Sequence, residues 1–124
     1  MKVLDGAGVS ELVRAFRQGN VVCLPTDTVY GLFCDAGNER SVHRIFKIKD
    51  RSLDKPLGIF VKDVETAKSC AEISEKQERI LRKYWPGKVT FVLKKRKDFC
   101  RGVGTENTIG IRIPDFDLFE RQSF

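Results

Sequence analysis

The turn Pro-Thr-Asp-Thr-Val-Tyr-Gly at 25–31 puts two hydroxyls and one carboxylate directly after an apolar run. Ligands of open α/β sheets sit beyond the carboxyl ends of strands, so Thr28 and its neighbours are candidates to bind a small polar ligand. The alternative is a turn in which the Asp and Thr side chains bond the backbone. Spacing alone favours this alternative.

The loop at 49–56 is a candidate anion-binding segment because it carries Lys49, Arg51 and Lys55. Arg offers a planar fork for phosphate oxygens, whereas Lys is a mobile point charge. Nucleotidyl transfer needs such cations, because its transition state spreads negative charge over the phosphate oxygens. For a lone basic cluster, the alternative is a solvated loop.

The segment Thr-Ile-Gly-Ile-Arg-Ile-Pro, which starts at Thr108, reads as a strand with two different faces. Its three isoleucines point one way, and Thr108 and Arg112 point the other way with Gly110 between them. A guanidinium in an apolar strand needs a carboxylate or phosphate, because burying it unpaired is costly. A ligand and an internal salt bridge to Asp27 or Asp115 are equally good candidates.

Hydrophobic periodicity and capping residues predict the elements that position these segments. The predicted helices span 9–18, 39–48, 63–69 and 75–84, and the predicted strands span 21–24, 32–34, 57–61, 90–93 and 109–113. The candidate N-caps are Asn38, Asp63 and Ser74, and Trp85-Pro86-Gly87 predicts a helix stop. Strands that alternate with helices predict an α/β fold, with residues 1–124 forming a single domain.

Composition narrows the class of protein. The chain has 124 residues, 41% hydrophobic and 32% charged, and a formal net charge of +6 that would attract polyanions. No apolar run approaches the roughly 18 residues of a membrane helix, and no apolar signal core is visible, so we expect a cytoplasmic protein without a membrane partner. Four widely spaced cysteines and one histidine predict no metal site.

Taken together, these motifs resemble the YrdC-like threonylcarbamoyl-AMP synthase family. The resemblance covers about residues 9–115 and rests on several motifs in order and spacing. They are PTDTVYGL at 25–32, KxR at 49–51, KPL at 55–57, WPG with a threonine at 85–90, and GIRIP at 110–114.

The resemblance implies a YrdC/RibB-like fold, in which a twisted mixed sheet with flanking helices forms a positively charged concave face. It implies an L-threonylcarbamoyladenylate synthase, a nucleotidyltransferase that condenses L-threonine, bicarbonate or CO2, and ATP, and releases pyrophosphate. Mg2+ should accompany the ATP. Partner proteins of such enzymes then transfer the threonylcarbamoyl group to adenosine 37 of tRNA.

The resemblance also implies roles for residues on the nucleotide side of the site. Lys49 and Arg51 would be catalytic, and Arg51, Lys55 and Thr108 would bind ATP. No residue is expected to bind a metal directly.

On the amino-acid side, Thr28 and Arg112 would bind L-threonine. Phe60 stands where some relatives have a polar ligand contact, and Phe116 where relatives often have histidine. Relatives also continue into a Ser-x-Asn element and further strands. We therefore expect a C-terminally shortened relative with an incomplete site and an open sheet edge. A homodimer through this edge, a partner chain that covers it, and marginal stability are the alternatives that follow.

Two other functions remain open at this stage. The first is a module that binds tRNA or double-stranded RNA through its basic face without catalysis. The second is a catalytically defective relative that binds only nucleotide.

Overall fold

A computed structural model describes most of the chain. The described residues are 2–3, 9–50, 56–97 and 102–115. The predicted site residues Arg51 and Lys55, as well as Phe116, lie outside these ranges. The chain divides into two compact units, one formed by 1–53 with 116–124 and the other by 54–115.

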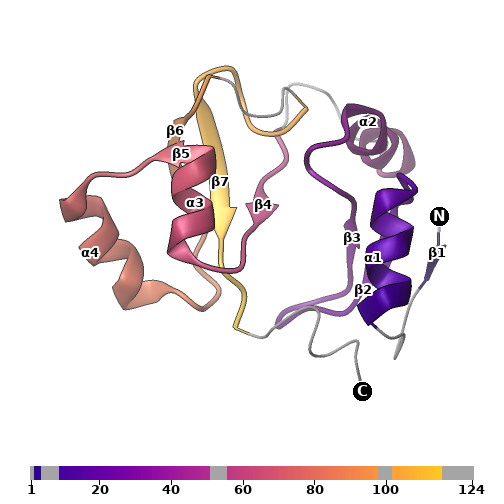
Figure 1. The fold of residues 1–124 in the computed structure, drawn as a ribbon, viewed down its shortest axis with the longest axis horizontal. Helices are drawn as coiled ribbons and strands as arrows, with labels where there is room; N and C mark the ends of the chain where they lie inside the picture. The colour runs from indigo at the N-terminus through magenta and orange to yellow at the C-terminus, as the bar shows by residue number, and fades with distance from the viewer. Residues whose placement is uncertain (1, 4–8, 51–55, 98–101, 116–124) are drawn as a thin grey trace. The chain divides into compact units, whose positions relative to one another are not determined.

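The first unit is a three-stranded sheet with two helices. Its order is β1-β2-β3, with β1 parallel to β2 and β2 antiparallel to β3 (Figure 1). Strand β1 was not predicted, and the other elements lie within about two residues of their predicted positions. The elements are β1 (Lys2–Val3), α1 (Val9–Arg17), β2 (Val22–Leu24), β3 (Gly31–Phe33) and α2 (Glu39–Ile48).

The core of the first unit forms where α1 packs on β2. Leu12 and Ala15 are buried with two strand residues, Val22 and Leu24. Val13 was predicted to lie on the buried face of α1, but it is only half-buried. Ala15 takes the central position instead, because it lies three residues from Leu12 on the same helical face.

Helix α2 begins at its predicted cap and is fastened to the end of α1. The Asn38 side chain accepts a hydrogen bond from the Ser41 backbone N–H at 3.1 Å, and the Ser41 hydroxyl donates to the Gly19 carbonyl at 2.9 Å. Gly19 has a φ of 77°, a conformation that ends α1 readily only with glycine. Ile48, an optional member of the predicted apolar stripe, is 44% exposed.

The second unit is a four-stranded mixed sheet with two helices. Its order is β4-β7-β6-β5, and only the β4–β7 pair is parallel; Figure 1 shows β7, in yellow, between β4 and β6. Strand β5 was not predicted, and β4 is shorter than the predicted 57–61. The elements are β4 (Ile59–Phe60), α3 (Val64–Cys70), β5 (Ala71–Glu72), α4 (Glu75–Tyr84), β6 (Phe91–Lys95) and β7 (Thr108–Arg112).

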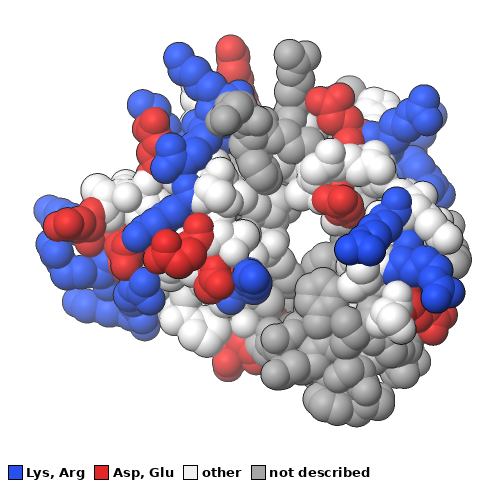
Figure 2. Space-filling view, in the orientation of Figure 1, with Lys and Arg blue, Asp and Glu red and all other residues white. Residues whose placement is uncertain are grey.

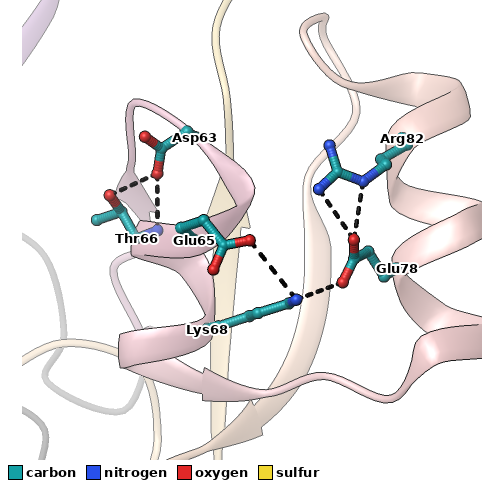
Figure 3. Close-up of polar contacts among 6 residues, drawn as sticks. All are labelled: Asp63, Glu65, Thr66, Lys68, Glu78 and Arg82. Atoms are coloured by element: carbon teal, nitrogen blue, oxygen red, sulfur yellow. Dashed lines mark hydrogen bonds and ion pairs between the residues drawn. The ribbon is translucent and has the colours of Figure 1, made fainter.

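Polar contacts cap and join α3 and α4, as Figure 3 shows. Asp63 caps α3 by accepting from the Thr66 backbone N–H at 2.7 Å. Lys68 of α3 forms an ion pair with Glu78 of α4, which also pairs with Arg82 (Figure 3).

The capping box at the start of α4 differs in one detail from the prediction. Ser74 is the cap as expected, but its reciprocal partner is Gln77, whose side-chain oxygen accepts from the Ser74 N–H at 2.9 Å. Glu78 was the predicted partner, and it points to Lys68 instead. Among the described residues, no helix is long and apolar enough to cross a membrane.

Candidate functional site

Arg112 is a buried cation with two defined contacts in the second unit. Its side chain is only 7% exposed, and its Nη1 donates to the Gly87 carbonyl oxygen at 2.8 Å. Its guanidinium carbon lies 4.5 Å from the centre of the Phe60 ring, in the distance range of a cation–π contact. Phe60 and Arg112 are register partners on β4 and β7. The guanidinium is therefore held from two directions.

The Trp85-Pro86-Gly87 turn ends α4, as the sequence predicts. Trp85 is the C-cap, and its indole Nε1 donates to the Val89 carbonyl at 2.9 Å. Its ring is buried and meets Phe91 edge-on, with 5.6 Å between ring centres. The predicted helix stop is confirmed, and the tryptophan ring also packs on a strand of the sheet.

Gly87 has a second role that the sequence analysis missed. Its N–H donates to the Ile113 carbonyl at 2.9 Å, while its own carbonyl accepts from Arg112. A Cβ at this position would lie 2.7 Å from the Tyr84 carbonyl oxygen, so a side chain does not fit. The tripeptide is visible in the sequence, but nothing in it identifies the strand to which it is joined.

Two glycines, Gly58 and Gly110, leave the backbone near Arg112 without side chains. A Cβ on Gly58 would meet the Gly110 carbonyl oxygen at 2.9 Å, whereas a Cβ on Gly110 would meet the Thr90 methyl at 3.3 Å and the Gly58 Cα at 3.9 Å. Opposite Gly110 in the register, Val92 is 71% exposed. This face of the sheet is therefore exposed at Val92 and partly exposed at Gly110, whereas Arg112 on the same face is buried.

Thr108 lies at the start of β7 and is held by a local hydrogen-bonded turn. Its hydroxyl oxygen lies 2.7 Å from that of Thr105, and its backbone N–H donates to the Thr105 hydroxyl at 2.9 Å. The Thr105 N–H in turn donates to the Thr108 carbonyl at 2.8 Å. Thr108 is half-buried and lies on the same strand face as Arg112, as predicted.

The turn that carries Thr28 is organised by Thr26. The Thr26 hydroxyl donates to the Val29 carbonyl and accepts from the Thr28 backbone N–H at 3.1 Å. For Thr26 this is the backbone-bonding alternative that the sequence analysis favoured. The Thr28 side chain is exposed, and its contact with a ligand stays a prediction.

Lys49 is the member of the predicted cation group that the structure describes. It is the C-cap of α2, its N–H donates to the Ile45 carbonyl at 3.0 Å, and its side chain is exposed. Asp50 follows with a φ of 50°, which turns the chain sharply after the helix.

The predicted site residues belong to different units. Thr28 and Lys49 lie in the first unit, and Thr108 and Arg112 lie in the second. The structure brings Thr108 and Arg112 together on one face of β7. That all of them surround a single anion-binding hollow stays a prediction.

The pKa shifts of Asp63, Glu78 and Cys70 have three different causes, which are a helix cap, an ion-pair network and burial. Hydrogen bonds from Thr66 lower the pKa of Asp63, and hydrogen bonds from Lys68 and Arg82 lower the pKa of Glu78. Burial raises the pKa of the Cys70 thiol, so it stays protonated as a core residue. Within the described ranges, no three or more His, Cys, Asp or Glu residues gather as metal ligands.

The fold and the site define a mixed α/β protein with a buried arginine fixed at the end of a central sheet strand. The family model described as "Telomere recombination", Sua5/YciO/YrdC, matches residues 14–121. The chain therefore belongs to the Sua5/YciO/YrdC family, as its motifs predicted.

Similar proteins within this family are named threonylcarbamoyl-AMP synthases. The Pyrococcus abyssi protein is 38% identical over 104 residues, which cover 82% of this chain and 31% of the relative. The Mus musculus protein is 32% identical over 116 residues, which cover 90% of this chain and 41% of the relative.

A solved structure described as P. abyssi Sua5 complexed with L-threonine shares this fold. Its TM-score is 0.85 at 30% sequence identity, and the match covers 97% of this chain and 38% of that one. The chain thus spans well under half the length of these three relatives.

Proposed function

We propose that this chain carries substrate-binding elements of an L-threonylcarbamoyladenylate synthase, a nucleotidyltransferase. The observation that carries the proposal is the family membership, together with relatives of at least 30% identity that are named threonylcarbamoyl-AMP synthases. The reaction would join L-threonine, bicarbonate or CO2, and ATP into L-threonylcarbamoyl-AMP and release pyrophosphate. Its product would serve the threonylcarbamoyladenosine modification of tRNA at position 37.

The proposed chemistry needs no covalent bond to the protein. The threonine amine and bicarbonate give a carbamate, whose oxygen attacks the α-phosphorus of ATP as pyrophosphate leaves. The protein positions the reactants and neutralises charge, and both effects lower the activation free energy substantially.

Arg112 would hold the amino-acid substrate. A guanidinium fixed by the Gly87 carbonyl and the Phe60 ring loses little further freedom when it meets a carboxylate. The solved relative that is described with L-threonine supports the same substrate here. The exposed hydroxyl of Thr28 would add a polar contact to the same molecule.

On the nucleotide side, Arg51, Lys55 and Thr108 would bind ATP, with Lys49 and Arg51 neutralising charge at the reacting phosphate. Mg2+ would accompany ATP. The described residues hold no cluster of three acidic, His or Cys ligands, so they do not fit a protein-held Mg2+. The ion would be bound by phosphate oxygens and water.

RNA binding as the main function has weaker support from the described surface. Lys94 pairs with Glu72, the Lys95 ammonium is buried, and Arg96 donates to the Lys68 carbonyl. Figure 2 also shows Asp and Glu interspersed with Lys and Arg over the surface formed by α3 and α4. A continuous basic face, which phosphate-driven binding requires, is not apparent in this view.

The decisive experiment is release of pyrophosphate that depends on ATP, L-threonine, bicarbonate and Mg2+ together. No release above background at high protein concentration would count against the proposal. Thermal stabilisation by ATP but not by L-threonine would instead indicate a relative that binds nucleotide only. Binding to tRNA that weakens steeply with salt, without pyrophosphate release, would indicate the RNA-binding alternative.

Two further partners and a compartment belong to the proposal. Proteins that transfer the threonylcarbamoyl group to tRNA would consume the product. A second copy of the chain would pair through a sheet edge. The cytoplasm, where tRNA is modified, would be the compartment.

A further inference from the structure

Lys95 is a buried lysine in the middle of an otherwise solvated basic run. Its side chain is 7% exposed, although Lys94 and Arg96 on either side are exposed. Lysine is almost never buried without a partner, because its ammonium loses hydration. The partners of the Lys95 ammonium should therefore explain why this lysine is buried.

Both described partners of the Lys95 ammonium are backbone carbonyls of one loop. Its Nζ lies 2.6 Å from the Val103 carbonyl oxygen and 3.4 Å from that of Thr105. The Lys95 backbone N–H also donates to the Asn107 carbonyl at 2.8 Å. One residue thus binds the loop 102–108 at three successive odd positions.

This loop ends in the hydroxyl pair of Thr105 and Thr108. Thr105 accepts from the Thr108 N–H, and the two hydroxyl oxygens are 2.7 Å apart. Gly104 allows the turn with a φ of 67°, and a Cβ there would lie 2.3 Å from the Thr108 carbonyl oxygen. The two carbonyl groups that the Lys95 ammonium contacts, those of Val103 and Thr105, lie on either side of Gly104 in this turn.

We infer that Lys95 is a positioning residue for nucleotide binding, because its ammonium fixes the loop that places the Thr108 hydroxyl. The ATP contact of Thr108 rests on the proposed function, whereas the Lys95-to-loop contact stands on the described geometry. Removal of the ammonium would leave the Val103 and Thr105 carbonyls without their donor and loosen the loop. Lys95 itself does not touch the substrate.

The test uses three variants and two independent readouts. Lys95→Met keeps the apolar stem and removes the ammonium, and Lys95→Arg keeps a cation with several donors. The matched control is Lys97→Met, at an exposed lysine of the same basic run. Amide hydrogen exchange of residues 102–108 reports the loop without any need for activity. Initial rates measured at varied ATP and at varied L-threonine concentrations give the KM for each substrate.

We expect Lys95→Met to speed exchange at Thr105 and Thr108 and to raise the KM for ATP, each by about tenfold, since a charged hydrogen bond is lost. The KM for L-threonine should stay within about twofold. Lys95→Arg should recover most of both effects, and Lys97→Met should show neither. Unchanged loop exchange in a folded Lys95→Met protein would overturn the inference.

The two hypotheses fail in distinguishable ways. Faster loop exchange with an unchanged KM for ATP would overturn the nucleotide role of the loop. If the unaltered chain neither binds ATP nor releases pyrophosphate, the proposed function is wrong, and so is the role of Lys95 in nucleotide binding. The exchange data would still show whether Lys95 holds the loop.

A measurement on the unaltered chain covers the case in which Lys95→Met does not fold. A buried ammonium bound by two carbonyls should give a slowly exchanging 1H–15N ammonium signal that disappears in Lys95→Arg. Absence of such a signal would contradict the contact.

Discussion

The Arg112 guanidinium donates a hydrogen bond to the carbonyl oxygen of Gly87, 25 residues earlier in the chain, at 2.8 Å. Gly87 forms a second hydrogen bond, in which its N–H donates to the carbonyl of Ile113. The turn after α4 and the end of β7 are therefore joined by two hydrogen bonds. A tripeptide that looks like a simple helix stop therefore also holds the Arg112 side chain.

Arg112→Lys should weaken L-threonine binding while leaving the fold intact. Lysine keeps the charge, but it lacks the planar fork that can contact a carboxylate, the Gly87 carbonyl and the Phe60 ring together. We expect the Kd or KM for L-threonine to rise on the order of tenfold to a hundredfold. Calorimetry and initial rates measure this.

Arg82→Lys is the matched control, because Arg82 forms a more exposed ion pair with Glu78 on α4. It should leave L-threonine binding unchanged. Equal binding by Arg112→Lys and the unaltered chain would contradict the proposed role of Arg112.

Gly87→Ala should destabilise the second unit. The new Cβ would approach the Tyr84 carbonyl oxygen to 2.7 Å, and backbone cannot move aside as a side chain can. We expect the free energy of unfolding to fall by about 1–3 kcal/mol, as for other overpacked sites. Urea denaturation followed by tryptophan fluorescence measures this, because Trp85 lies next to the altered residue.

Gly37→Ala provides the comparison, since its Cβ would meet only an Asp35 side-chain oxygen at 3.3 Å. Its free energy of unfolding should change by no more than about 0.5 kcal/mol. Equal stability of the two variants would show that the turn at Gly87 tolerates a side chain.

Gly110→Ala should separate binding from stability. Its Cβ would meet the Thr90 methyl at 3.3 Å and the Gly58 Cα at an ordinary contact distance of 3.9 Å, so the fold should accommodate it with small shifts. The methyl group would, however, stand on the strand face between Thr108 and Arg112. We expect substrate affinity to fall about tenfold with a nearly unchanged urea midpoint. Unchanged affinity for both ATP and L-threonine would place the substrates elsewhere.

The Asp63 cap should make stability fall in acid. Hydrogen bonds from Thr66 hold the pKa of Asp63 below its ordinary value of 3.8, so the unfolded chain binds the proton more readily. The stabilisation is therefore fully present above that ordinary value and is lost as pH falls through the lower, folded-state pKa. Urea midpoints measured at neutral pH and at about pH 3 follow this loss.

Asp63→Asn keeps a capping side chain but cannot titrate, so its midpoint should fall less on acidification than that of the unaltered chain. Asp63→Ala should be less stable than both at neutral pH. An identical acid response of Asp63→Asn and the unaltered chain would show that other carboxyl groups cause the loss.

Much of the fold follows from local sequence. Asn38, Asp63 and Ser74 cap helices as predicted, because a short polar side chain satisfies backbone N–H groups only a few residues away. The alternation at 108–112 likewise determined which face of β7 is buried, since the period of a strand is two. Family membership was also visible from the spacing of motifs.

The strands that sequence missed, β1 and β5, have two residues each and exist only through their neighbours. Such segments carry no periodicity of their own. The same reason explains the shortening of β4, whose pairing with β7 is restricted to Ile59 and Phe60.

What only the tertiary structure decided is which distant groups hold the site residues in place. Residue types alone could nominate Arg112 and Thr108, because a guanidinium in an apolar strand and a hydroxyl at its start are unusual in themselves. Their supports, the Gly87 carbonyl and the Lys95 ammonium, come from other elements, and a backbone carbonyl has no sequence signature. Long-range hydrogen bonds to the backbone form only where the fold brings distant segments together, so local sequence does not predict them.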